Sequence, residues 1–143
     1  YERKQYLKNL LEESDVVTVH CPLNNETRGL INDEFIATMK SGSMLINTGR
    51  GQVLLDLDCI EKHLRSGHLS AVSFDVLPQE PPSFDHPLIS AWKNNEEWAV
   101  GRITINPHSS YYSEQALFEM RYKAAETIRI FFKEGLLRNQ VLV

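Results

Sequence analysis

The chain has 143 residues, of which 42% are apolar and 24% are charged, and its formal net charge is −4. This is about the length of one domain, and the composition excludes fibrous, collagen-like and fully disordered proteins. The mild acidity gives no electrostatic reason to expect nucleic acid or an anionic membrane as a partner, and no apolar run approaches the roughly 20 residues that span a bilayer.

The chain begins with neither an initiator Met nor a signal-peptide pattern, so we expect a C-terminal piece of a longer protein. Its two cysteines, Cys21 and Cys59, form no CxxC pair, which favours reduced thiols in a cytoplasmic or nuclear protein over a disulfide. The five histidines show neither an HExxH motif nor an i, i+4 pair, so we expect no metal site.

Helical and extended patterns alternate along the chain. Apolar residues at helical spacing mark the helices, and short β-branched runs mark the strands. In chain order we expect a helix at residues 2–13, a strand at 16–21, a helix at 32–39, a strand at 44–47, a helix from Asp56 or Asp58 to Arg65, a strand at 69–76, an irregular insert at 83–101, a strand at 102–106 and a long helix from Ser113 to Lys133.

Local signals support these boundaries. The first strand, VVTVHC, resembles a strand buried on both faces of a sheet. Ser113 is a suitable helix cap, and Gly67 and Gly135 are placed to end helices in the left-handed conformation. Strands that alternate with helices indicate βαβ units, and right-handed crossovers make this an α/β fold, a doubly wound parallel sheet with helices on its faces.

Ligands of an open α/β sheet bind beyond the carboxyl ends of its strands. The predicted strands are followed there by Arg50, by Asp75 and Glu80, and by His108. One arginine, two carboxylates and one histidine are thus expected at one edge of the sheet. Because an unpaired buried charge is costly, such a collection indicates a functional site.

These four side chains suit hydride transfer between a 2-hydroxy acid and a 2-oxo acid. Arg50 offers a planar fork to a carboxylate and its neighbouring carbonyl oxygen. His108 exchanges the hydroxyl proton, and Glu80 hydrogen-bonds the far imidazole nitrogen and fixes its tautomer. Asp75 accepts hydrogen bonds from a nicotinamide carboxamide, and the cofactor supplies the hydride.

Purely structural roles are open for each of the same residues taken alone. Arg50 could lie on the surface, Asp75 could cap a strand end, Glu80 could be solvated in its loop, and His108 could be structural. Four further residues are interpreted as packing residues: His20 and Cys21 at a strand end, and Trp92 and Trp98 beneath a loop.

A family resemblance is carried by the run INTGRGQVLLDLDCIEKHLRSGHLSAVSFDVLPQEPP, followed by NPH, which is similar to the D-isomer-specific 2-hydroxyacid dehydrogenases. The preceding SDVVTVHCPLNNETRGLIN resembles the segment before it in that family. The resemblance covers the chain from about Leu10 to Gly135. The stretch NPHSSYYSEQALFEMRYKAAETIR looks most like the C-terminal-binding-protein branch of NAD-sensing transcriptional corepressors.

The resemblance implies a role for each matching residue. Arg50 matches the substrate-binding arginine, Glu80 the histidine-partner acid, His108 the catalytic acid/base and Asp75 the carboxamide-binding aspartate. Tyr111 stands where the corepressor branch has a Trp in the substrate pocket. The positions that bind or line the cofactor are matched by Cys21, Pro22, Thr27, Thr48, Gly49, Arg50, Asp75 and His108.

No G-x-G-x-x-G occurs in the chain, although that loop places the dinucleotide pyrophosphate on a helix N-terminus. The resemblance therefore implies the second half of a Rossmann NAD-binding domain, with residues 113–135 forming the helix that leads back toward a substrate domain. We expect the isolated chain to bind NAD weakly and to be inactive. A homodimer is implied by the resemblance only.

The main functional hypothesis is an NAD-dependent D-2-hydroxyacid dehydrogenase acting on a small 2-oxo or 2-hydroxy acid. The alternative is an NAD(H)-sensing corepressor of the C-terminal-binding-protein type with transcription-factor partners. An inactive Rossmann module is a third interpretation.

Overall fold

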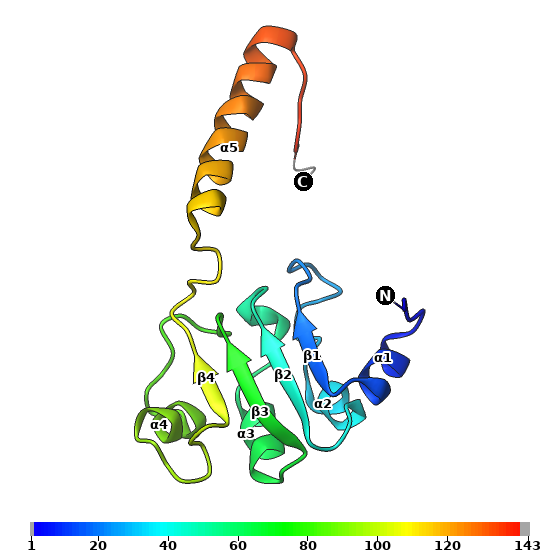
Figure 1. Cartoon of the computed structure of the whole chain (residues 1–143), viewed down its shortest axis with the longest axis vertical. Helices are drawn as coiled ribbons and strands as arrows, with labels where there is room; N and C mark the ends of the chain where they lie inside the picture. Colours follow the sequence, from blue (N-terminus) through cyan, green and yellow to red (C-terminus); the bar gives the residue numbers. More distant parts are fainter. Residues whose placement is uncertain (1, 141–143) are drawn as a thin grey trace. The chain divides into compact units, whose positions relative to one another are not determined.

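The computed structural model describes residues 2–140, which fall into two compact units that divide between His108 and Ser109. The first unit holds a parallel sheet in the order β1-β2-β3-β4 (Figure 1). Its elements are α1 (Leu7–Glu13), β1 (Val16–Val19), α2 (Asp33–Thr38), β2 (Ser43–Asn47), the 3-10 helix η1 (Gly51–Val53), α3 (Asp58–Arg65), β3 (Leu69–Phe74), α4 (Pro87–Lys93) and β4 (Ile103–Ile105). The predicted α/β fold with a parallel sheet is confirmed.

Burial alternates along β1, because the helices of the first unit cover one face of the sheet. Val17 and Val19 are buried, whereas Val16 and Thr18 are exposed. Helix α2 contacts α1 and α3, and α3 contacts α4, so the helices form one layer. Right-handed crossovers that all step in the same direction require this arrangement. The prediction that residues 16–21 are buried on both faces is therefore wrong.

Helices α2 and α3 begin where the sequence predicts. Asn32 Oδ1 accepts the Phe35 N–H at 2.9 Å, and Asp56 Oδ1 accepts the Cys59 N–H at 2.9 Å, so each first turn has a capping acceptor. Gly67 follows α3 in the left-handed conformation, with φ of 77°.

Helix α4 lies within residues 83–101, where the sequence predicts an irregular insert. Pro87 opens its first turn, and His86 Nδ1 accepts the Leu88 N–H at 3.1 Å. Histidine is outside the usual set of capping residues, so the sequence rules miss this helix. At the N-terminus the sequence predicts too long a helix. Helix α1 begins at Leu7 rather than at residue 2, and it buries only Leu11.

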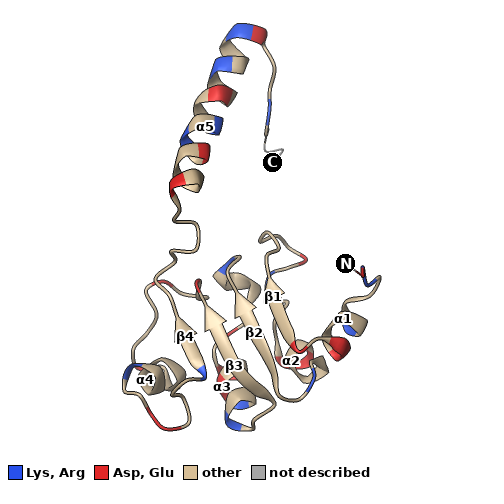
Figure 2. Cartoon of the chain, in the orientation of Figure 1, with Lys and Arg blue, Asp and Glu red and all other residues tan. Residues whose placement is uncertain are grey.

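The second unit contains the long helix α5 (Glu114–Glu134). As predicted, Ser113 Oγ accepts the Ala116 N–H at 3.1 Å, and Gly135 ends the helix with φ of 67°. Charges of both signs lie along α5, whereas strands β1–β4 carry none (Figure 2). Among residues 2–140, no helix is both long enough and apolar enough to cross a bilayer.

Candidate active site

The carboxyl ends of all four strands lie at one edge of the sheet, because the strands are parallel (Figure 1). Cys21 follows β1, Arg50 follows β2, Asp75 follows β3 and His108 follows β4. This edge is where open α/β sheets bind their ligands. The predicted residues therefore share the edge that the sequence analysis assigns to them.

His108 and Glu80 form a hydrogen-bonded pair. His108 Nδ1 lies 2.8 Å from Glu80 Oε2, and Glu80 Oε1 accepts the Leu77 N–H at 2.8 Å. Because an ionised carboxylate only accepts hydrogen bonds, the proton between the two side chains is carried by His108 Nδ1. In the neutral imidazole Nε2 is then the unprotonated ring nitrogen, the atom that can accept a second proton.

The His108 backbone is held in the left-handed region, with φ of 53°, which is uncommon for a residue with a side chain. Its N–H donates to Asp75 O at 2.9 Å and to Asn106 O at 3.0 Å. The Asn106 N–H donates in turn to Phe74 O at 2.8 Å. These bonds fix the backbone of His108 at the end of β3, and strain of this kind is concentrated at functional sites.

Asn47 connects the loop of Arg50 to Asp75. Its side chain is fully buried, with Oδ1 accepting the Gly49 N–H at 3.0 Å and Nδ2 donating to Arg50 O at 3.1 Å. Its backbone carbonyl accepts the Asp75 N–H at 3.0 Å. Sequence reasoning gave Asn47 no role, although an amide at a strand end before a glycine-rich loop is a usable signal.

Gly51 brings the Arg50 loop against the loop that carries Glu80. A Cβ at position 51 would overlap the carbonyl group of Leu77 and would lie 2.9 Å from Pro78 N. Only glycine permits such a close backbone approach. The exposed Arg50 guanidinium donates from Nη1 to Gly49 O at 2.8 Å, so it lies beside this junction.

The ends of β1 and β2 also meet closely. A Cβ on Gly49 would come within 3.2 Å of Cys21 O and 3.3 Å of Val19 O, so the glycine lets the two strand ends pack closely. His20 Nδ1 lies 3.1 Å from Thr48 Oγ1, and His20 Nε2 lies 2.9 Å from Thr18 Oγ1. His20 is exposed and bridges the two strand ends through these side-chain contacts.

Thr27 organises the loop that follows β1. Its hydroxyl donates to Pro22 O at 2.7 Å and accepts the Asn24 N–H at 2.9 Å. The structure thus gives Thr27 a loop-closing role beside Pro22. The cofactor-lining roles of both residues stay predictions.

A cavity of about 410 Å³ opens beside the His108–Glu80 pair. Its polar end is formed by Asp75, Glu80, Asn106 and His108, and Asp75 is only 4% exposed. The rest of its wall is apolar and includes Leu77, Phe84, Trp92 and Ile105. The site thus combines a hydrogen-bonded His–Glu pair with an adjoining apolar space.

The two tryptophans differ in their surroundings. Trp98 packs against the core, and the Arg65 guanidinium lies 4.0 Å from its ring centroid. Trp92 packs against the core as expected, but it also lines the cavity, which sequence reasoning missed. Tyr111 belongs to the second unit, where its ring makes an edge contact with Tyr112, and its place in a substrate pocket stays a prediction.

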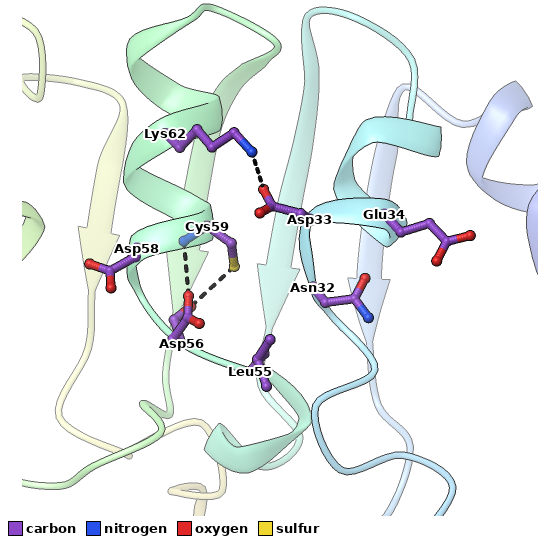
Figure 3. A pocket seen from close by; sticks show the side chains of 8 residues that line it. All are labelled: Asn32, Asp33, Glu34, Leu55, Asp56, Asp58, Cys59 and Lys62. Atoms are coloured by element: carbon purple, nitrogen blue, oxygen red, sulfur yellow. Dashed lines mark hydrogen bonds and ion pairs between the residues drawn. The ribbon is translucent and has the colours of Figure 1, made fainter.

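A second cavity of about 410 Å³ lies between the first turns of α2 and α3 (Figure 3). Its polar side chains are used in structural contacts, since Lys62 donates to Asp33 at 2.9 Å and Cys59 Sγ donates to Asp56 O at 3.2 Å. Lys62, and then His63, hold the pKa of Asp33 below its usual 3.8. Burial raises the pKa of Cys59 to about 12.

One group of three possible metal ligands, Asp58, Glu61 and His86, is present among residues 2–140. His86 Nδ1 accepts the Leu88 N–H, so its Nε2 carries the proton and donates to Asp58 Oδ1 at 3.0 Å. Glu61 accepts from Arg65 Nε at 2.7 Å. Metal binding through Nε2 would break this arrangement, so we assign these contacts a structural role.

Residues 1–110 match the family described as D-isomer specific 2-hydroxyacid dehydrogenase, NAD binding domain. The chain is 36% identical over 129 residues to a glyoxylate reductase of Aeropyrum pernix, covering 90% of the chain and 35% of the relative. It is 46% identical over 118 residues to a formate dehydrogenase of Neurospora crassa, covering 82% and 30%.

The fold is similar to that of a D-isomer specific 2-hydroxyacid dehydrogenase from Xanthobacter autotrophicus, crystallised in complex with NADPH and MES. The TM-score is 0.76 at 32% identity, covering 95% of this chain and 40% of the other. The chain thus spans less than half the length of each of these proteins. These matches do not show the corepressor branch.

Proposed function

This chain belongs to the D-isomer-specific 2-hydroxyacid dehydrogenase family of NAD-binding domains, and from that premise we propose that it forms the catalytic edge of an enzyme that reduces a 2-oxo acid to a 2-hydroxy acid. The residues at this edge fit the nicotinamide end of a dinucleotide. Asp75 places a buried carboxylate on the wall of the cavity beside His108, where it can accept hydrogen bonds from a carboxamide. When bound, the cofactor supplies the hydride.

The residues of the chain supply binding and the proton. Arg50 holds the substrate carboxylate and polarises the neighbouring carbonyl oxygen with its planar donors. His108 gives the proton on Nε2 to that oxygen as the hydride reaches the carbonyl carbon, which balances the reduction to a hydroxyl group. Glu80 keeps the proton on Nδ1 and stabilises the charged imidazole before transfer.

The observation that carries this proposal is the 2.8 Å bond between His108 and Glu80 at the edge shared with Arg50 and Asp75. It also separates two chemistries found among the relatives. Oxidation of formate removes a hydride and releases carbon dioxide, so it requires no transfer of a hydroxyl proton. Reduction of a 2-oxo acid requires one, and the His108–Glu80 pair is suited to give it.

The direct test uses the complete protein that contains this chain rather than the chain alone, and it measures the loss of NADH absorbance when that protein is given glyoxylate or pyruvate. We expect 2-oxo-acid-dependent oxidation of NADH. The proposal would be overturned by formate-dependent reduction of NAD⁺ with no turnover of any 2-oxo acid.

We expect Glu80→Gln to lower kcat/KM for 2-oxo acid reduction by about 10- to 100-fold, because a hydrogen bond to a charged group is worth about 1.5–3 kcal/mol. The glutamine amide keeps the shape and an acceptor for the Leu77 N–H but removes the charge beside His108. Steady-state kinetics of the two single variants and the double variant with His108→Asn measure the coupling. If Glu80 acts through His108, the double variant is no slower than His108→Asn; additive losses would contradict this.

The two cysteines give a test of the cofactor-lining prediction that does not depend on turnover. Cys21 is partly exposed at the end of β1, whereas Cys59 is buried and its pKa is raised to about 12. At mildly alkaline pH, iodoacetamide should alkylate Cys21 and spare Cys59, because the thiolate is the nucleophile. Mass spectrometry should show that NADH slows alkylation of Cys21. Equal rates with and without NADH would contradict the placement of Cys21 at the cofactor.

A further inference from the structure

The cavity beside His108 has an apolar wall that proton transfer and carboxylate binding leave unused. Phe84, Trp92 and Ile105 contribute to this wall, and they come from the loop after β3, from α4 and from β4. A space of about 410 Å³ is within the range of small-molecule sites, about 300–1,000 Å³. It is larger than glyoxylate, which has no side chain, would need.

The cavity is continuous with the proposed active site. Its polar end includes His108 and Glu80, and its wall includes Leu77, whose carbonyl Gly51 packs against. Leu77 therefore lines the cavity and also contacts the loop of Arg50. A 2-oxo acid has a carboxylate, a carbonyl and a side chain. If Arg50 binds the carboxylate and His108 contacts the carbonyl oxygen, the side chain is the part of the substrate that can enter the cavity.

We infer that this cavity binds the side chain of a 2-oxo acid that carries a bulky apolar group, either branched aliphatic or aromatic. The inference rests on the proposed function and deepens it by naming the substrate class. An acidic side chain is disfavoured, because the carboxylates of Asp75 and Glu80 lie at the polar end of the cavity. An apolar side chain gains from removal of its surface from water against Phe84 and Trp92.

Phe84 is the wall residue to change, because its side chain is 55% exposed and the core does not depend on it. Lys93 Nζ lies 4.6 Å from its ring centroid, on a residue that does not line the cavity. Phe84→Ala therefore trims the wall and leaves Trp92 in place. Phe132→Ala is the matched control, since Phe132 is 79% exposed on α5 and is no part of this cavity.

The kinetic test compares 4-methyl-2-oxopentanoate with pyruvate as substrates for NADH oxidation. Each buried CH₂ is worth about fourfold in affinity, so we expect the unaltered protein to prefer the branched substrate by about tenfold or more in kcat/KM. Phe84→Ala should reduce severalfold the ratio of kcat/KM for the branched substrate to kcat/KM for pyruvate, whereas Phe132→Ala should leave that ratio intact. No preference in the unaltered protein, or a preference that Phe84→Ala does not change, would overturn the inference.

A binding measurement separates this inference from the proposed function. In a Trp98→Phe background the remaining tryptophan of this chain is Trp92, which lines the cavity. 4-Methyl-2-oxopentanoate should change Trp92 fluorescence at concentrations where pyruvate does not. Turnover of pyruvate without a selective fluorescence change overturns the cavity assignment alone. A selective fluorescence change without turnover of any 2-oxo acid supports the cavity and overturns the proposed function.

Discussion

His108→Asn should lower kcat/KM for 2-oxo acid reduction by about 10²–10⁴-fold, the usual contribution of a positioned general acid. The variant keeps the backbone but removes the group that carries the proton. Asparagine is among the residues that best tolerate the left-handed region, and His108 has φ of 53°. A loss of activity then reports the missing imidazole rather than a displaced loop. The measurement is steady-state NADH oxidation with the preferred 2-oxo acid.

His86→Asn is the matched control for this prediction. His86 is also a histidine bonded to a carboxylate, at 3.0 Å from Asp58, but it lies outside the cavity and caps α4. Asparagine is a good helix cap, so the control removes a His–carboxylate pair with little effect on folding. If His108→Asn kept activity within a few-fold of the unaltered protein, the proton-transfer role would be lost. If His86→Asn lowered kcat/KM by the same factor as His108→Asn, the loss could not be assigned to the active site.

Much of the edge was predictable because it follows from topology. Parallel strands bring their carboxyl ends together, so Arg50, Asp75 and His108 could be placed at one edge once the strands were recognised. Glu80 lies outside any strand, and its partnership with His108 followed from its chemistry and from the family resemblance. The 2.8 Å bond between the two side chains confirms that partnership.

The remaining features depend on tertiary contacts that periodicity does not encode. Asn47 is fully buried, and its side-chain amide bonds Gly49 and Arg50 of the loop after β2, which only the folded structure shows. Trp92 could be predicted as a packing residue, but which loop it faces depends on α4, a helix with a histidine cap. The first strand looked buried on both faces because composition cannot tell which faces the crossovers leave uncovered.

Gly51→Ala should destabilise the protein by about 3 kcal/mol or more, at the upper end of the usual cost of overpacking, because the added methyl group meets backbone rather than a flexible side chain. The Cβ would overlap the Leu77 carbonyl, and Pro78 N would lie 2.9 Å away. The two loops must then separate, which moves Arg50 away from the loop of Glu80. Since a misplacement of about 1 Å costs about 10²-fold in rate, we also expect kcat/KM to fall by about that factor.

Gly42→Ala separates the two ways in which a glycine can be required. Gly42 has φ of 81° with nothing within 4 Å of an added Cβ, so its substitution costs only the left-handed backbone penalty of about 1–2 kcal/mol. Urea unfolding should therefore rank Gly51→Ala as the more damaging change, although Gly51 has no positive φ. Gly42→Ala should keep its kcat/KM, because it leaves the catalytic edge untouched. Equal stability losses, or full activity in Gly51→Ala, would show that the junction between the two loops does not hold Arg50 in place.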